Sequence, residues 1–291
     1  MDRLLTRRAP RSSRAVAAQA ASFGRTATFM MMFALLLVLA TAMAAMAQKA
    51  EAPFEPQVGQ AGKDVVWVPT PQALVDKMLD MAKATPSDYL IDLGSGDGRT
   101  VITAAKRGLT AHGIEYNPKM VEVAVAAAKA AGVSDKATFE KADLFESDFS
   151  KAQIITMFLL PWINEKLSPT LLTLKPGTRL VSNTFTMGEW QPDETANVTD
   201  DCVNYCKALL WIVPAKAEGT WQLGEAELKL KQSYQMLSGT LGPTEITDAR
   251  LKGNAISFNV GNVSYTGTLD GKSMTGTVSG GSNATWTATM K

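Results

Sequence analysis

The sequence predicts an α/β protein with a doubly wound sheet, followed by a small antiparallel β segment. Between residues 72 and 185, short apolar runs alternate with stretches whose apolar residues recur at helical spacing. One apolar run continues into "IDLGSGDGRT" (91–100), where three glycines are spaced two apart. After about residue 219 the helical pattern stops, and turn sequences such as "LKGN" and "LDGK" recur at short intervals.

The α/β part alternates strands with helices. In "QALVDKMLDMAKA" the apolar residues Leu74, Met78 and Leu79 have helical spacing, while Pro118 and Gly132 mark the start and the end of a later helix. "AQIITMFLL" is apolar throughout, as expected at the centre of a parallel sheet. The expected helices cover 72–84, 99–107, 118–132 and the stretch from 161 to the "KPG" at 175–177, and the expected strands cover 89–94, 111–117, 137–144, 152–160 and 178–185.

The C-terminal part contains a small repeat. "LSGTL" (237–241), "YTGTL" (265–269) and "MTGTV" (274–278) each have the alternation of a strand, and Asp270-Gly271 favours a hairpin turn. We expect an antiparallel meander that forms a small barrel or a sandwich.

The pattern of the first 47 residues is typical of an export signal. Residues 1–28 hold six arginines and one acid, an apolar core follows, and Ala45-Met46-Ala47 matches a signal-peptidase site. Two alternatives remain. Phe29 to Ala47 is long enough for an uncleaved inner-membrane anchor, and the Arg-rich opening also suits a mitochondrial presequence. We therefore expect an exported, periplasmic or membrane-anchored protein, with a leader at 1–47, a linker at 48–64, a first domain at 65–218 and a β domain at 219–291.

Composition argues against a nucleic-acid partner. Cleavage after Ala47 would leave 23 basic and 27 acidic residues, a net charge of −4, with only four arginines. The two cysteines, Cys202 and Cys206, have no neighbouring histidines, so no metal site is expected. They either form a disulfide, which would require a bent backbone, or remain as two unpaired thiols.

The glycine-rich stretch predicts a nucleotide site that is specific for S-adenosyl-L-methionine (SAM). Its spacing is G-x-G-x-G, with Arg99 where the NAD fingerprint has a glycine, and the GK[ST] ending of a phosphate-binding loop is absent. Asp92 precedes the first glycine by two residues and would repel a pyrophosphate. An acid at that place suits the ammonium group of SAM, which carries no phosphate.

Two further acids follow the next two strands. Glu115 can accept both ribose hydroxyls, and Asp143 can accept from the adenine amino group while Leu144 packs on the ring. Each acid taken alone has an ordinary structural explanation. Three acids at successive strand ends behind a glycine loop indicate SAM.

These segments resemble a known enzyme class. "DLGSGDG", "GIEYNP" and "KADLF" are similar to the first three motifs of class I, seven-strand SAM-dependent methyltransferases. "WVPTP" (67–71), "DLGSGDGRTVITAAKRG" (92–108) and "FLLPWIN" (158–164) resemble a protein-lysine methyltransferase family with mitochondrial membrane-associated members and bacterial homologues. The resemblance covers about residues 65–215.

The resemblance implies a role for several residues. The methionine end of SAM would be lined by Asp92, Gly94, Ser95, Gly96 and Asp97, and Thr70 with Pro71 would approach the ligand from the preceding segment. The fold's last two strands would form an antiparallel hairpin, for which 208–215 and 219–224 are the candidates.

The acceptor site is less well marked. Many amine methyltransferases have a polar-Pro-Pro-aromatic motif after the fourth strand, and here Leu159 replaces the polar residue. Trp162 and Asn164 are the candidate acceptor-site residues, although Trp162 suits core packing equally well. The segment 189–194 either lies over the pocket or, as its three acids favour, forms a solvated loop, and Trp190 is the residue to test.

The expected activity is transfer of a methyl group from SAM to a protein lysine. A small-molecule acceptor is the first alternative, because Leu159 departs from the amine motif. The second is an exported binding or scaffold protein without catalysis, since SAM is made in the cytosol.

Overall fold

The computed structural model describes residues 31, 32, 34, 54–280 and 284–291. The predicted leader therefore lies almost entirely outside the described residues. Within the described ranges, no helix is both long and apolar enough to cross a membrane. The chain from Phe54 onward forms one of two units and contains both the sheet and the barrel described below.

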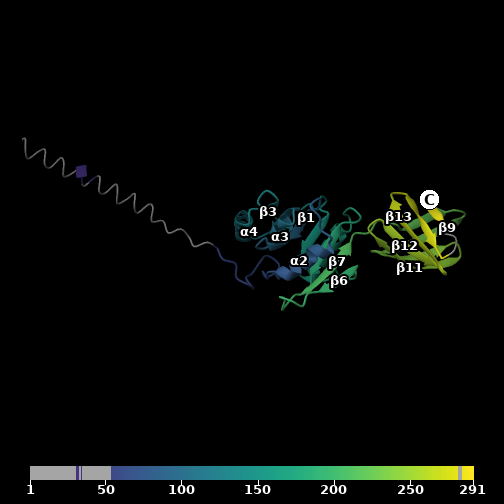
Figure 1. The fold of residues 1–291 in the computed structure, drawn as a ribbon, viewed down its shortest axis with the longest axis horizontal. Coiled ribbons are helices and arrows are strands. Elements are labelled where there is room, and N and C mark those ends of the chain that lie inside the picture. The colour runs from purple at the N-terminus through teal and green to yellow at the C-terminus, as the bar shows by residue number, and fades with distance from the viewer. Residues whose placement is uncertain (1–30, 33, 35–53, 281–283) are drawn as a thin grey trace, which may run out of the picture. The chain divides into compact units, whose positions relative to one another are not determined.

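The first part of this unit is a seven-stranded sheet in the order β3-β2-β1-β4-β5-β7-β6 (Figure 1). Strands β1 to β5 are parallel, whereas β7 runs antiparallel to both β5 and β6. The elements are α2 (Gln72–Met81), β1 (Tyr89–Leu93), α3 (Arg99–Lys106), β2 (Thr110–Glu115), α4 (Pro118–Ala130), β3 (Ala137–Lys141), β4 (Ile154–Met157), α5 (Pro161–Leu171), β5 (Arg179–Asn183), β6 (Glu194–Asn197) and β7 (Lys207–Ile212).

Helices cover both faces of the sheet because successive strand residues point to opposite sides. In β1, Leu90 packs in one core cluster with residues of α2, α3 and α4, whereas Ile91 and Leu93 pack in a second cluster with residues of α5. The doubly wound α/β prediction is confirmed. Strand order reverses between β1 and β4, and in such sheets ligands bind at the carboxyl ends of the strands beside this reversal.

The sequence-based prediction for the antiparallel edge of the sheet is partly wrong. The segment 208–215 does supply β7, but 219–224, the expected partner, belongs to the C-terminal barrel. The edge strand is β6, a short and mostly exposed "ETAN" that pairs only with β7. An exposed edge strand carries no alternation of apolar and polar residues, so periodicity could not reveal it.

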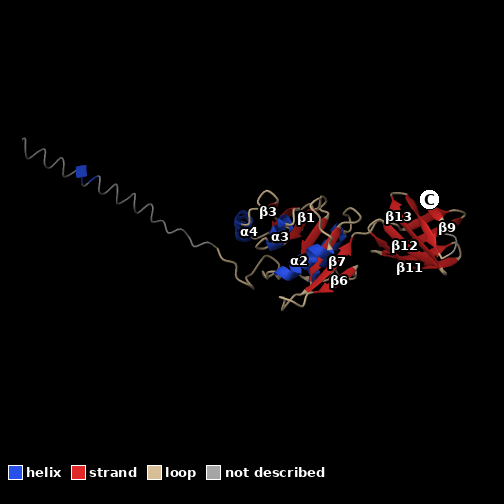
Figure 2. Ribbon diagram, viewed as in Figure 1, coloured by secondary structure: helices blue, strands red, loops and turns tan. Residues whose placement is uncertain are grey.

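The second part is a closed barrel of eight antiparallel strands (Figure 2). Trp221, Phe258 and Trp286 pack inside it, and the barrel closes where β15 pairs with β8. The antiparallel prediction is confirmed, with the barrel form realised. The strands are β8 (Gly219–Leu223), β9 (Ala226–Ser233), β10 (Met236–Leu241), β11 (Thr244–Lys252), β12 (Ala255–Val260), β13 (Val263–Asp270), β14 (Ser273–Ser279) and β15 (Thr285–Met290).

A buried junction joins the barrel to the sheet. Trp190 is fully buried in the sheet's second core cluster and stacks on Tyr234 of the barrel, with ring centroids 5.8 Å apart. Gln235 donates to the Gln191 carbonyl at 2.7 Å, and Arg250 pairs with Asp193 at 2.7 Å. The expectation of a solvated loop is wrong for Trp190, because this junction buries its side chain.

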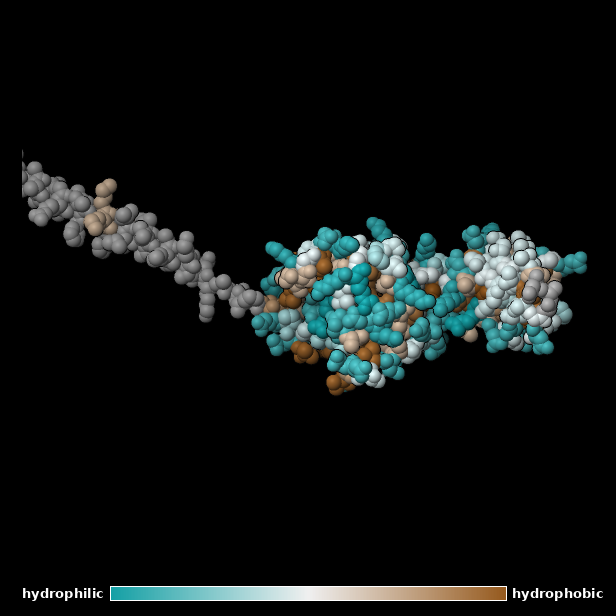
Figure 3. All heavy atoms as spheres, viewed as in Figure 1, coloured by the Kyte–Doolittle hydropathy of each residue, from teal (hydrophilic) through white to brown (hydrophobic). Residues whose placement is uncertain are grey.

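Cys202 and Cys206 form a disulfide with Cα atoms 5.8 Å apart, so the bridged alternative applies. The loop it closes lies between β6 and β7 and includes Tyr205, which has a positive φ, as does Asp201 just before the first cysteine. In Figure 3 the visible surface of the sheet part is mostly hydrophilic, with hydrophobic residues in small scattered groups, and much of the visible barrel surface has intermediate hydropathy.

Candidate active site

A cavity of about 470 Å³ lies at the carboxyl ends of β1, β2 and β4, where the strand order reverses. This volume is within the range of small-molecule sites. Residues that follow these three strands line it, together with the segment 60–70 that precedes α2. Of the predicted SAM residues, those lining the cavity are Thr70, Asp92, Gly94, Ser95, Gly96, Asp97, Glu115, Asp143 and Leu144, whereas Pro71 does not line it.

The glycine loop turns sharply because Gly94, Gly96 and Gly98 all have positive φ, at 73°, 54° and 80°. Two of these glycines also lack room for a side chain. A Cβ on Gly96 would lie 2.6 Å from the Trp67 indole nitrogen, and one on Gly98 would lie 2.6 Å from the Phe139 ring. The loop is therefore held close to its neighbours as well as turned toward the cavity.

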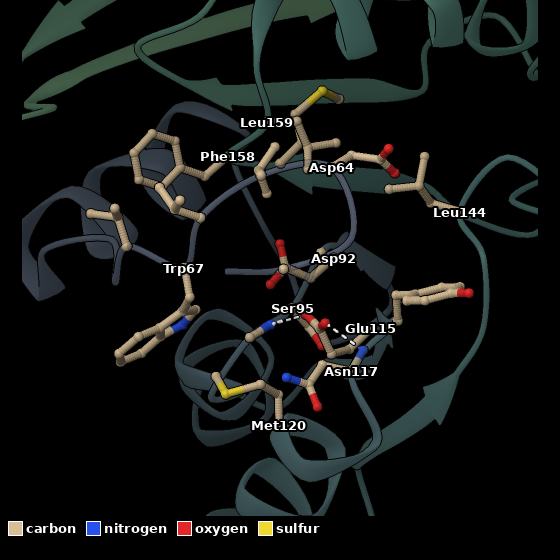
Figure 4. Close-up of a pocket in the computed structure, with 18 of the residues that line it drawn as sticks. Asp64, Trp67, Asp92, Ser95, Glu115, Asn117, Met120, Leu144, Phe158 and Leu159 are labelled. Carbon is tan, nitrogen blue, oxygen red and sulfur yellow. Dashed lines mark hydrogen bonds between the residues drawn. The ribbon is translucent and has the colours of Figure 1, made fainter. Parts of the chain in front are cut away.

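Asp92 is buried at the end of β1 and points toward the centre of the cavity (Figure 4). Burial raises the pKa of its carboxyl to about 7, and the nearby acids Asp97 and Glu115 add to the shift. Thr156 opposes it by donating a hydrogen bond to Asp92 at 2.6 Å. A cationic ligand group beside this carboxyl would favour its charged form.

Glu115 ends β2, and its two carboxylate oxygens accept from the backbone N–H groups of Gly96 and Asn117, each at 2.9 Å (Figure 4). It thereby ties the glycine loop to the second strand. A carboxylate can accept about four hydrogen bonds, so these two leave capacity for ligand hydroxyls.

Asp143 follows β3 and forms an ion pair with Lys63. The hydrogen bond from the Lys63 ammonium, and a second from the Phe145 N–H, hold the pKa of Asp143 below its usual range. Leu144, beside it, lines the same cavity.

The segment 60–70, which we name the strap, forms one wall of the cavity. Trp67 packs on Gly96, and Thr70 is held from two sides. Its carbonyl accepts from Arg99 at 3.0 Å, and its hydroxyl accepts from Asn183 at 3.3 Å. Arg99, which stands where the NAD fingerprint has a glycine, also donates two hydrogen bonds from its guanidinium to the Asp97 carboxylate. It therefore joins the strap to the glycine loop.

These residues fit SAM. Ser95 Oγ is a buried hydroxyl without a hydrogen-bond partner among the described residues, so a ligand can satisfy it. Asp92 offers a carboxylate for the ammonium, Glu115 has spare acceptor capacity for the ribose, and Leu144 supplies an apolar surface for the adenine. A single cavity contains all four features.

The other end of the cavity is aromatic and apolar. Phe158, Leu159 and Leu160 follow β4 and line it, together with Phe185 after β5 and Tyr205 from the disulfide loop. Neither Trp162 nor Asn164 is a lining residue. Trp162 is 46% exposed, whereas Asn164 is fully buried and donates to the carbonyls of Phe185 and Thr186, each at 3.2 Å.

Sequence reasoning missed the strap residues Lys63 and Trp67, as well as Phe158, Phe185 and Tyr205. The "WVPTP" segment stands out in the sequence, but nothing in it shows that Trp67 packs on the glycine loop. Phe185 and Tyr205 are 20 residues apart, and their side chains meet only because β5 and β7 are neighbours in the sheet.

The fold and this site define a class I SAM-dependent methyltransferase. The family model described as the ANTKMT methyltransferase domain matches residues 92–194. A protein-lysine N-methyltransferase of Saccharolobus islandicus is 44% identical over 144 residues, covering 48% of this chain and 89% of that protein. The chain belongs to this protein-lysine N-methyltransferase family.

Two further comparisons each match part of the chain. The Mus musculus adenine nucleotide translocase lysine N-methyltransferase is 35% identical over 120 residues, which is 40% of this chain and 52% of the mouse protein. The crystal structure of an RNA methyltransferase from Salinibacter ruber with S-adenosyl-L-homocysteine is 45% identical, with a TM-score of 0.48, and the match covers 51% of this chain and 95% of that one.

Proposed function

We propose that this methyltransferase transfers the methyl group of SAM to the Nε of a lysine in a protein substrate. The observation that carries the proposal is the cavity with two unlike ends. The glycine-loop end offers a buried carboxylate and a hydroxyl without a partner among the described residues, and the opposite end is mostly apolar and opens to solvent at Tyr205, which is 43% exposed. A long side chain with an amine at its tip can enter such an opening.

The chemistry is an in-line displacement. The lone pair of the neutral lysine nitrogen forms a bond to the methyl carbon as the carbon–sulfur bond breaks, and the electron pair of that bond stays on sulfur. The methylated ammonium then releases a proton to solvent. The chain's task is to orient the amine and to exclude water, and the apolar side chains of Phe158 and Leu159 favour the neutral amine by desolvation.

The residue roles are part of the proposal. Asp92, Gly94, Ser95, Gly96 and Asp97 hold the methionine end of SAM, Glu115 the ribose, and Asp143 with Leu144 the adenine. Thr70 supports the ligand from the strap. Pro71 and Asn164 act indirectly: Pro71 precedes α2 next to Thr70, and Asn164 holds the Phe185 backbone. Trp162, exposed near the opening residue Leu160, is proposed to contact the protein that carries the lysine.

Labelled SAM tests the activity. The purified chain is incubated with labelled SAM and either a membrane or a periplasmic extract, and labelled proteins are mapped by mass spectrometry. Methylated lysines are expected, and they should be absent with Asp92→Asn. Label confined to small molecules would support the small-molecule alternative. Calorimetry with SAM adds a further check, since no binding at high micromolar concentration would support the scaffold alternative.

For location, we propose export or anchoring by the N-terminal segment, with a mitochondrial address as the alternative. The Cys202–Cys206 bridge supports export, because disulfides persist mainly in oxidising compartments. N-terminal sequencing of the protein from fractionated cells tests it. A chain that begins after Ala47 in the periplasm is expected, whereas an intact N-terminus in the cytosolic fraction would contradict export.

A further inference from the structure

Three aromatic rings from separate segments meet at the apolar end of the cavity. Phe158 follows β4, Phe185 follows β5, and Tyr205 lies in the loop before β7. Their ring centroids are 5.9 Å apart for Phe158 and Phe185, 5.1 Å for Phe158 and Tyr205, and 6.0 Å for Phe185 and Tyr205. We name this group the aromatic wall. All three rings line the cavity that also contains Asp92.

Two members of the wall are fixed from the sheet side. Phe158 directly follows a buried central strand. The Phe185 carbonyl accepts from Ser182 at 2.7 Å and from the buried Asn164 amide at 3.2 Å. These hydrogen bonds hold the turn after β5, in which Thr184 has a φ of 62°.

Tyr205 is held differently. It is 43% exposed and has a φ of 56°, a conformation that non-glycine residues seldom adopt without support. Its neighbour Cys206 is bridged to Cys202, which closes a loop of only a few residues around the tyrosine. The disulfide therefore constrains the backbone that places the Tyr205 ring on Phe158 and Phe185.

We propose that the aromatic wall binds the alkyl stem of the acceptor lysine and the cationic head of its methylated forms, and that the disulfide positions Tyr205 for this task. The inference rests on the proposed function and names the part of the site that recognises the acceptor. Aromatic faces attract ammonium groups electrostatically, and methylated ammonium is the preferred ligand of such faces because it is weakly hydrated. The Leu159 and Leu160 side chains beside the wall provide apolar contact for the stem.

The wall is consequently sensitive to redox conditions. A dithiol such as dithiothreitol supplies two electrons and two protons, which convert the bridge into two thiols while the dithiol becomes a cyclic disulfide. The chain has only two cysteines, so this reagent acts at one place in the protein. Reduction frees Tyr205 to leave its left-handed conformation, and the wall loses one of its three rings.

Butyltrimethylammonium tests the wall directly, because it carries the stem and the head of a trimethylated lysine. Its binding to the full chain is measured by calorimetry in the presence of S-adenosyl-L-homocysteine. Tyr205→Ala is expected to weaken binding about tenfold, and Tyr205→Phe should retain most of it. Dithiothreitol should weaken binding by the wild type to a similar extent, whereas the Cys202→Ser/Cys206→Ser variant should start weak and show no response.

Val203→Ala is the matched control, since Val203 lies in the same loop, is 92% exposed and is not a cavity residue. SAM affinity, measured on every variant, verifies that the fold and the glycine loop are intact. Wild-type binding of butyltrimethylammonium by Tyr205→Ala, or binding unaffected by reduction, would overturn the inference.

The lysine-labelling assay separates this inference from the proposed function. If the wild type methylates protein lysines but Tyr205→Ala does so with an unchanged KM for the acceptor protein, the inference fails while the function stands. If the wild type labels no protein lysine although butyltrimethylammonium binds at the wall, the proposed acceptor fails and the wall remains a cation site. A raised KM with little change in kcat is the expected result.

Discussion

Asp92 is a carboxyl group whose charge is set by its surroundings. Burial, with the neighbouring Asp97 and Glu115, raises its pKa to about 7, so it is largely protonated in mildly acidic solution. The ammonium of SAM favours the charged form. Binding therefore expels a proton below pH 7, and we expect SAM affinity to weaken by up to about tenfold per pH unit as the pH falls below that value. Calorimetry between pH 5.5 and 8.5 measures this, and Asp92→Asn should show weak, pH-independent binding.

The same pKa shift predicts how stability depends on pH without ligand. A carboxyl whose pKa is raised on folding binds its proton more tightly in the folded chain than in the unfolded one. Its contribution to stability is thus present at low pH and is lost as the pH rises from about 4 through about 7. Urea unfolding at pH 5 and pH 8 should show a smaller pH-dependent loss for Asp92→Asn than for the wild type. Equal losses would argue against a raised pKa.

Gly98 combines a positive φ with a lack of space. A Cβ there would lie 2.6 Å from the Phe139 ring and 2.9 Å from Ala124 Cβ, at a φ of 80°. We expect Gly98→Ala to lower the free energy of unfolding by about 2–4 kcal/mol, from strain and overpacking together. Gly132→Ala is the control, because Gly132 has a φ of 69° but open space around it. Its cost should be only about 1 kcal/mol. Chemical denaturation compares the two.

At the scale of elements, the strap is the piece that completes the cavity. Its backbone hydrogen bonds are local, such as Trp67 N–H to the Gln60 carbonyl at 2.9 Å, and the contacts of Trp67 and Thr70 with Gly96 and Arg99 place it over the glycine loop. Contacts with neighbouring elements, more than pairing with a strand of the sheet, therefore hold the strap in place.

Trp67→Ala should therefore weaken SAM binding by about tenfold, because it removes the main contact between the strap and the glycine loop. The melting temperature without ligand should change little, since Trp67 is only half-buried and belongs to neither core cluster. Val58→Ser serves as the control, because Val58 is 69% exposed and does not line the cavity. Binding by Trp67→Ala as tight as by Val58→Ser would refute the role given to the strap.

Sequence patterns predicted the elements where burial imposes a period. The parallel strands carry apolar runs, and Pro118 and Pro161 open helices as expected. The pattern failed for β6, because an exposed edge strand has no apolar face. It also failed for the acceptor end of the site. Phe158, Phe185 and Tyr205 acquire a shared role only when three distant segments are brought together, and no local spacing encodes that meeting.

For the whole molecule, the junction decides whether the sheet and the barrel behave as one unit. Asp193 has a side chain only 2% exposed, and it accepts from Arg250 of the barrel and from the Ile212 N–H. Trp190 and Tyr234 stack beside it. These contacts predict a single cooperative unfolding transition for the chain from residue 54 onward.

Arg250→Ala should lower the free energy of unfolding by about 1–3 kcal/mol, because it leaves a buried carboxylate without its cationic partner. Combining it with Asp193→Asn should recover part of that loss. Lys291→Ala is the control, since Lys291 pairs with Glu227 at the surface and no measurable change is expected. Thermal unfolding followed by circular dichroism checks both expectations. Two separate transitions in the wild type would contradict the junction's role.

A rigid junction also determines which lysines the enzyme can reach. Any partner held by the barrel would present its surface to the cavity from one starting point, provided that the contacts of Trp190, Gln191 and Asp193 hold the barrel in place. The distance between the docking point and the cavity would then determine which lysine of the partner reaches the methyl group. Target choice would follow the three-dimensional shape of the partner, and the residues on either side of the lysine would matter little.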